Sequence, residues 1–144
     1  MVLDRVFLSH AGILGLISFA LMIAGVWLAR RAVARKEFKR PQRRVHGLLL
    51  LPSYVIALVH VGMGVAILLP LFEQFVGIEA VLHIVHIALA LLFVYYFTMV
   101  IVQGYRGVMK CRDGYIVLGL QALVILLGYI LRNVAFGEII YPFL

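Results

Sequence analysis

The stretch I-E-A-V-L-H-I-V-H-I-A-L-A-L-L-F-V-Y-Y-F-T-M-V-I-V-Q-G (Ile78–Gly104) decides the fold of this chain. It contains a single charged residue, Glu79, and as an α-helix rising about 1.5 Å per residue it is long enough to cross the roughly 30 Å hydrocarbon core of a bilayer. Three other apolar runs have comparable length: Val6–Ala29, Val45–Phe72 and Gly114–Ala135. The sequence therefore predicts four transmembrane helices.

Composition places the chain among membrane proteins. Of its 144 residues 65% are hydrophobic and only 13% are charged, and the mean hydropathy is +1.13. This apolar content exceeds what the core of a soluble domain of this size can bury. Because the four runs occupy nearly the whole chain, we predict one domain over residues 1–144, an all-α integral membrane four-helix bundle.

The basic residues are concentrated on one side of the predicted membrane. Eleven of the thirteen lie in the first and third connections: Arg30, Arg31, Arg35, Lys36, Lys39, Arg40, Arg43, Arg44, Arg106, Lys110 and Arg112. Basic loops stay in the cytoplasm, so both termini are predicted to be extracytoplasmic, in a prokaryotic plasma membrane or its equivalent. The net charge of +7 is then explained by topology and by contact with membrane lipids, and no nucleic-acid partner is predicted.

Four histidines fall inside the apolar runs: His10, His60, His83 and His86. Ionisable side chains at membrane depth are rare and usually functional, and imidazole binds haem iron, copper and zinc. Counted along antiparallel neighbouring helices, His60 and His86 both lie roughly 12–15 Å below the outer surface, where they can face each other. We predict that these two are the metal ligands of a bound cofactor. His83, one turn closer to the outer surface, is the alternate for His86, and His10 lies at a depth similar to that of His83.

Two kinds of cofactor are consistent with these histidines. Haem b needs two axial ligands, a hydrophobic slot and cations for its propionates, and ligation by two histidines favours electron transfer. A copper or zinc site would instead use three or four histidines, drawn from His10, His60, His83 and His86. Haem b is the first choice and copper the alternative.

Other residues are predicted to surround a haem. Arg132, on the same helix face as Gln121 and Gly128, is expected either to pair with a propionate or to reach the outer headgroups. Gly64, four residues after His60, provides either clearance for the macrocycle or a close helix contact.

If haem is the cofactor, a contact with quinone is a further expectation. Its expected lining consists of Tyr54, Tyr95, Tyr96 and Gln121, whose alternative role is packing or anchoring at the membrane interface.

The order of motifs resembles a family of small four-helix membrane proteins linked to haem–copper oxidase maturation. The resemblance covers roughly residues 24–135 and rests on R-R-x-H (Arg43–His46), H-x-x-x-G (His60–Gly64) and L-H-I-x-H-I-A-L-A (Leu82–Ala90), followed by a basic turn. It implies that His46, His60 and His86 match the family's recurring histidines. The family's further histidine after the third helix has no counterpart in Arg106–Gly114.

More loosely, the layout is similar to that of four-helix b-type cytochromes. Members of that group with two haems need a second pair of ligands on the cytoplasmic side, where this chain offers only His46. The resemblance therefore implies one haem.

The sequence thus predicts a b-type cytochrome-like membrane subunit. It would transfer electrons between quinol and an extracytoplasmic or partner-bound redox centre, through one haem ligated by two histidines and together with other subunits of a membrane redox complex. The alternatives are a non-catalytic oxidase assembly or accessory protein that binds copper or haem, and a structural transmembrane subunit of a respiratory complex. No catalytic residue is assigned, and whether the protein is an enzyme is left open.

Overall fold

The computed structural model describes residues 2–71 and 77–136, and the side chains of residues 12–66, 77, 78 and 80–131. These residues form four helices: α1 (Val2–Ala34), α2 (Arg40–Leu71), α3 (Ile78–Arg106) and α4 (Cys111–Phe136). The shortest has 26 residues, about 39 Å at 1.5 Å per residue, and all four are long and apolar enough to cross a membrane. The predicted all-α, four-helix fold is confirmed.

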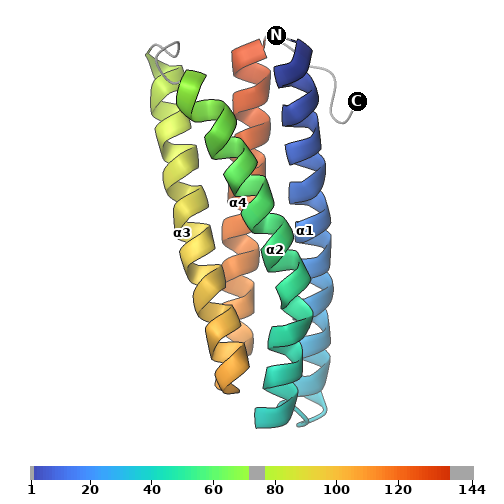
Figure 1. Cartoon of the computed structure of the whole chain (residues 1–144). Helices are drawn as coiled ribbons and strands as arrows, with labels where there is room; N and C mark the ends of the chain where they lie inside the picture. Colours follow the sequence, from blue (N-terminus) through green and yellow to red (C-terminus); the bar gives the residue numbers. More distant parts are fainter. Residues whose placement is uncertain (1, 72–76, 137–144) are drawn as a thin grey trace.

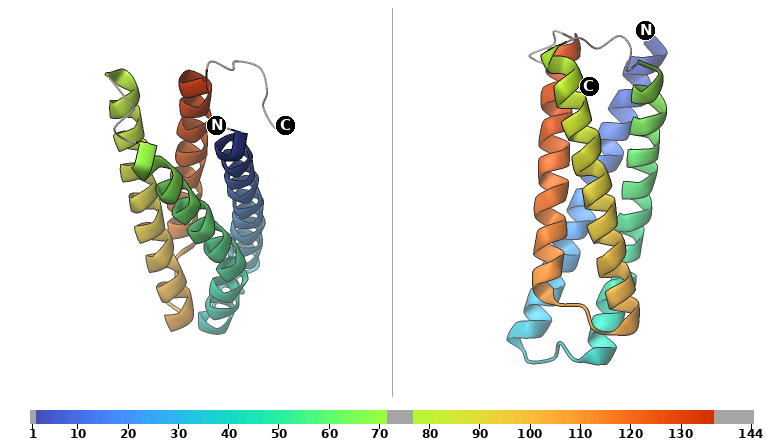
Figure 2. Two further views of the ribbon diagram at one scale, coloured as in Figure 1. Left: turned by 45° about the horizontal axis from the view of Figure 1, so that its top comes forward. Right: turned by 90° about the vertical axis from the view of Figure 1, so that its left-hand side faces the viewer.

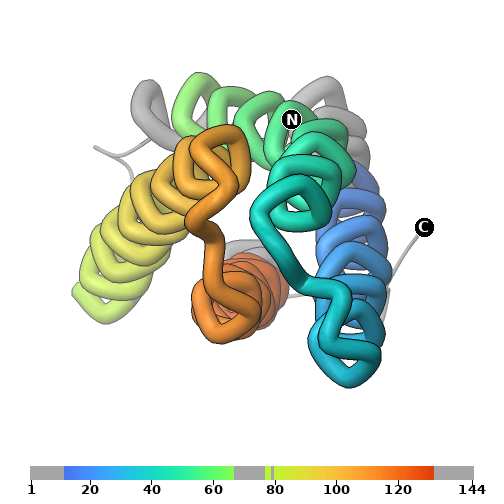
Figure 3. Tube along the Cα trace, turned by 90° about the horizontal axis from the view of Figure 1, so that it is seen from below, coloured from blue at the N-terminus to red at the C-terminus, as the bar shows by residue number. Residues whose placement is uncertain are grey.

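The helices form an antiparallel bundle in which each one packs against its neighbours in the chain. α1 packs on α2, α2 on α3 and α3 on α4, and contacts between α4 and α1 close the ring. Seen from below, α4 lies between α1 and α3 on the side opposite α2 (Figure 3). α2 runs obliquely across the bundle (Figures 1 and 2). The start of α1 and the end of α4 therefore share one end.

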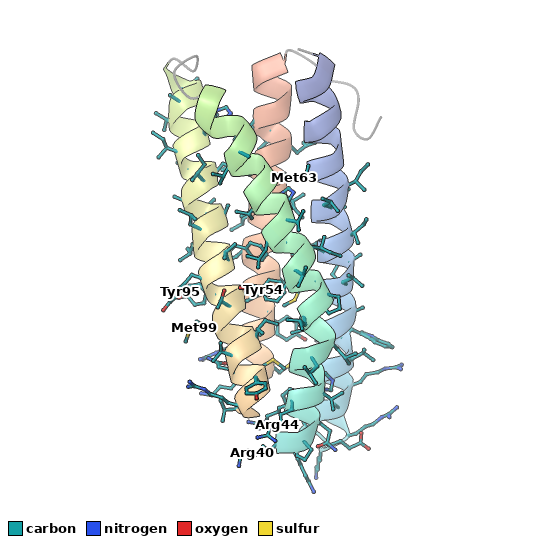
Figure 4. The ribbon with its side chains drawn as sticks, viewed as in Figure 1. Arg40, Arg44, Tyr54, Met63, Tyr95 and Met99 are labelled. Atoms are coloured by element: carbon teal, nitrogen blue, oxygen red, sulfur yellow. The ribbon has the colours of Figure 1, made fainter. Side chains whose placement is uncertain are left out.

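The helices extend further into the first basic connection than the apolar runs do. α1 continues to Ala34 and α2 begins at Arg40, so only residues 35–39 lie between them. Arginine and alanine are good helix formers, and Pro41 stands in the first turn of α2, where its missing N–H is not needed. The loop between α1 and α2 and the loop between α3 and α4 lie at the same end of the bundle, which we call the basic end. Arg40 and Arg44 mark it in Figure 4.

Two helices stop at the basic end in the same way. The N–H of Lys36 donates to the Val33 carbonyl at 2.9 Å, and the N–H of Glu37 donates to the Ala32 carbonyl at 2.9 Å, a Schellman motif that closes α1. The same motif closes α3, where Gly107 takes the corresponding position. This position has a positive φ in both, 58° at Lys36 and 71° at Gly107. Only α3 is followed by the glycine that such a backbone favours, whereas α1 is followed by a lysine there.

Replacing Lys36 with glycine is therefore expected to stabilise the fold by about 0.5–1 kcal/mol, because a Cβ is strained in the left-handed region. The midpoint of thermal unfolding in detergent, followed by circular dichroism, measures the change. Arg35→Gly removes the same charge from the neighbouring residue, whose φ is not positive, and should bring no gain. Equal stabilisation by both variants would assign the effect to charge instead of backbone strain.

Glycines set the closest helix contacts. A Cβ on Gly47 would lie 2.7 Å from the Cα of Gly104, so the backbones of α2 and α3 touch near the basic end. A Cβ on Gly114 would lie 3.2 Å from Cγ2 of Val26, which marks a second close approach, between α4 and α1. Both contacts fix how the helices are aligned along the bundle.

The interior of the basic half of the bundle is apolar. All four helices contribute buried side chains to it, among them Met22, Val26, Leu50, Phe97, Val100 and Val117. Moving away from the basic end, polar side chains join the buried apolar ones in the interior, first two serines and a glutamine and then histidines. We call this opposite end of the bundle, where α1 begins and α4 ends, the histidine end.

Candidate cofactor site

Three histidines gather in the half of the bundle towards the histidine end. His60 belongs to α2, and His83 and His86 are one turn apart on α3, so neighbouring antiparallel helices supply them. His83 is almost completely buried, with 3% of its surface exposed. Both His60 and His83 lie within electrostatic range of His86. The structure therefore brings the predicted ligands His60 and His86 into one region, together with the alternate His83.

Each of the two predicted ligands packs against a glycine of the neighbouring helix. A Cβ added to Gly15 of α1 would lie 3.2 Å from Cε1 of His60, and one added to Gly128 of α4 would lie 3.1 Å from Cε1 of His86. A larger residue at either glycine would displace the imidazole ring. All four helices thus contribute to the region, two through a histidine and two through a glycine that leaves room for it.

His86 has a buried atom with no protein partner. Within the part of the chain that the structure describes, its Nδ1 makes no hydrogen bond. Leaving a buried polar atom unsatisfied costs about 1–3 kcal/mol, so such an atom usually interacts with water or a ligand. An imidazole in this state is available to bind a group that the protein itself does not provide.

The depths of the two histidines differ more than the sequence predicts. Gln121 of α4 and Ser18 of α1 are hydrogen-bonded and lie at the same level. From that level Gly128, which faces His86, is seven residues further towards the histidine end, and Gly15, which faces His60, is three. The difference of four residues places the His86 ring roughly 6 Å beyond the His60 ring. His83 lies one more turn away. Of the two histidines on α3, His86 is therefore the better match to His60.

An offset of one turn does not prevent a shared ligand. Packed helices are about 8–10 Å apart, so a displacement of about 6 Å tilts the line that joins the two imidazoles without moving either ring out of the interior. His60 and His86 are therefore the residues that would hold such a ligand.

A buried polar layer lies next to the histidines on the side of the basic end. The Ser18 hydroxyl donates to the Ser53 carbonyl, and the Ser53 hydroxyl donates to the Ser18 carbonyl, each at 2.8 Å. Gln121 Nε2 donates to the Ser18 hydroxyl oxygen, also at 2.8 Å. All three residues are buried, and Oε1 of Gln121 has no partner among the described residues. The layer joins α1, α2 and α4.

This layer gives a stability prediction. Ser18→Ala removes the acceptor of the Gln121 amide and is expected to cost about 2 kcal/mol, because it leaves a buried N–H donor unpaired. Adding Gln121→Leu removes that donor, so the double variant should be more stable than Ser18→Ala alone. Denaturant unfolding in detergent micelles compares the two. A double variant that is less stable than the single one would show that the glutamine contributes through packing instead.

Three other predicted site residues have different outcomes. His10 and Arg132 lie in α1 and α4, but their side chains are outside the described residues. The backbone of His10 is five residues beyond Gly15 and therefore close to the level of His86. A Cβ on Gly64 would meet nothing within 4 Å among the described residues, so the predicted close helix contact is not found there.

The residues predicted to line a quinone contact are divided between the interior and the surface of the bundle. The Tyr54 hydroxyl donates to the Thr98 hydroxyl oxygen at 2.8 Å inside the bundle, since Thr98 uses its own hydrogen on the Val94 carbonyl. Tyr95 points away from the bundle (Figure 4) and contacts Tyr96, with ring centroids 5.6 Å apart. Gln121 is buried in the polar layer. Tyr95 and Tyr96 are thus exposed, whereas Tyr54 and Gln121 lie inside the bundle.

His46 lies at the basic end, fourteen residues and about 21 Å from His60 along α2. Its Nδ1 is 2.7 Å from the Gln42 carbonyl, and its ring meets the edge of Phe38 at 5.2 Å. Only 9% of its surface is exposed, so it is a packed interior residue instead of one that meets lipid headgroups. It makes no contribution to the region around His60 and His86.

No multi-ligand metal centre is found in the described part of the chain. Its histidine, cysteine and acidic side chains include no group of three or more placed to hold one metal ion. The copper or zinc alternative therefore cannot be built from His60, His83 and His86 alone. Ligation by two histidines needs no third protein ligand.

The supporting residues Gly15, Ser18 and Ser53 were not singled out from the sequence. A signal for them exists, because Gly15 and Ser18 are three residues apart and Ser53 and His60 seven, spacings that place each pair on one helix face. Comparison of the chain with protein families, with characterised proteins and with solved structures found no match to any of them.

Proposed function

We propose that this protein is an integral membrane electron carrier, a b-type cytochrome-like subunit with one haem b held between His60 and His86. The observation that carries the proposal is the pair of imidazoles. They come from adjacent antiparallel helices, each lies against a glycine, and His86 has a buried ring nitrogen without a partner in the described structure.

The haem would supply reversible one-electron chemistry, and the residues of the chain would bind, orient and insulate it. His60 and His86 would provide the two nitrogen ligands, and Gly15 and Gly128 leave room for their rings. Arg132, four residues before the end of α4 at the histidine end of the bundle, is our candidate for the propionate counter-charge.

An absorbance scan of the purified protein tests this proposal. Sharp α and Soret bands after reduction are expected for a haem ligated by two histidines. Bound copper without these bands would favour the oxidase assembly or accessory protein. A protein with neither would be a structural transmembrane subunit. Quinol as donor and a partner-bound acceptor are part of the same proposal and follow only if the bands are present.

We further propose that the basic end faces the cytoplasm and that both termini lie outside. Eight positive charges between Arg30 and Arg44 strongly resist transfer across a membrane. In right-side-out vesicles, external protease should therefore remove terminal tags and spare an epitope placed within residues 35–40. Loss of the epitope with retention of the tags would reverse the orientation.

A further inference from the structure

The basic end carries an exposed aromatic–cation pair on α1. The guanidinium carbon of Arg31 lies 3.9 Å from the centroid of the Trp27 ring, and both residues are exposed. A guanidinium stacked on a ring keeps its N–H groups free at the edge, in the planar arrangement that binds phosphate oxygens. Tryptophan rings favour the headgroup region of a membrane, and Trp27 lies near the basic end of α1, where that region is expected.

Arg30, on the adjacent face of α1, extends this positive surface towards α4. Its guanidinium lies within electrostatic range of Cys111, at the start of α4, whose chain neighbours Lys110 and Arg112 are exposed. The contact between Val26 and Gly114 one turn deeper holds the two helices together here. Positive charges from two separate segments of the chain thus converge on one edge.

We propose that this edge, formed by Trp27, Arg30, Arg31, Lys110 and Arg112, binds the headgroup of an anionic phospholipid. The charge complementarity is strong, because the eleven basic residues of the two loop regions are accompanied by only two acidic ones, Glu37 and Asp113. Arg31 contacts the phosphate while stacked on Trp27, and Arg30 supplies a second cation. The acyl chains then lie along the apolar surface of α1. This binding is independent of the proposed haem.

Trp27 makes the proposal directly measurable, because it is the only tryptophan in the chain. The whole protein is reconstituted into phosphatidylcholine vesicles that contain brominated phosphatidylglycerol, and the quenching of tryptophan fluorescence is compared with that by brominated phosphatidylcholine. We expect phosphatidylglycerol to be favoured at Trp27 by about three- to fivefold. Equal quenching by the two lipids would overturn the proposal.

Matched double variants separate a site from general attraction. Arg30→Gln with Arg31→Gln should reduce the lipid preference to about one, whereas Arg35→Gln with Lys39→Gln removes the same charge from the loop and should preserve it. Equal losses in both double variants would show diffuse electrostatics and refute the site. Inorganic phosphate, compared with chloride at equal ionic strength, should not abolish the preference. If it does, the ligand is free phosphate and the lipid proposal is wrong.

Discussion

Alanine at His60 or at His86 is expected to abolish the low-spin haem spectrum of the purified protein. Each substitution removes one of the two proposed nitrogen ligands, and iron with a single histidine ligand gives a high-spin spectrum or loses the haem. The measurement is the reduced-minus-oxidised difference spectrum, normalised to protein. Added imidazole should restore part of the low-spin signal in His86→Ala, because the ring leaves a space beside Gly128.

The other histidines serve as controls for this experiment. His46→Ala, at the basic end, and His83→Ala, two turns beyond the level of His60, should both keep the low-spin spectrum. His10→Ala is the most informative, because its backbone lies near the level of His86 on α1. Loss of the spectrum in His10→Ala with retention in His60→Ala would replace the proposed ligand pair by His10 and His86.

Gly104→Ala is expected to destabilise the bundle by about 2–3 kcal/mol, and Gly104→Leu to prevent α2 and α3 from packing. A Cβ at Gly104 would lie 2.6 Å from the Cα of Gly47, and this neighbour is backbone that cannot rotate away. Unfolding in detergent with increasing dodecyl sulfate, followed by circular dichroism, measures the loss.

Gly119→Ala is the matched control, because a Cβ at this position of α4 would meet nothing within 4 Å among the described residues. It should be neutral or slightly stabilising, since alanine is the better helix former. If Gly104→Ala behaved like Gly119→Ala, the close contact between α2 and α3 would not exist in the folded protein.

The four helices could be predicted from the sequence because each apolar run has at least the roughly 20 residues that a membrane crossing requires. Their ends could not be placed as well. Hydropathy marks where apolar residues stop, whereas α1 and α2 continue through arginines, which favour helix without being apolar. The boundary at Lys36 depends on a Schellman motif whose usual glycine is absent, so the sequence carries no clear signal for it.

The candidate site was predictable only in part, for a geometric reason. Counting residues from the ends of apolar runs places His60 and His86 at one depth, but the alignment of two helices depends on contacts such as that of Gly47 with Gly104, which the count ignores. The glycines that face the histidines belong to α1 and α4. Which helix lies opposite which is a property of the packed bundle and is not visible in any single run.

The apolar layer between the polar interior and the basic end has an electrical consequence. In a membrane most of the transmembrane voltage would fall between His60 and the basic end, because His60 lies only eleven residues from the other end of the 32-residue α2. A charge that reaches His60 from the histidine end crosses about one third of the transmembrane voltage, which corresponds to about 0.8 kcal/mol per 100 mV. Charge transfer at this position would therefore respond only weakly to the membrane potential.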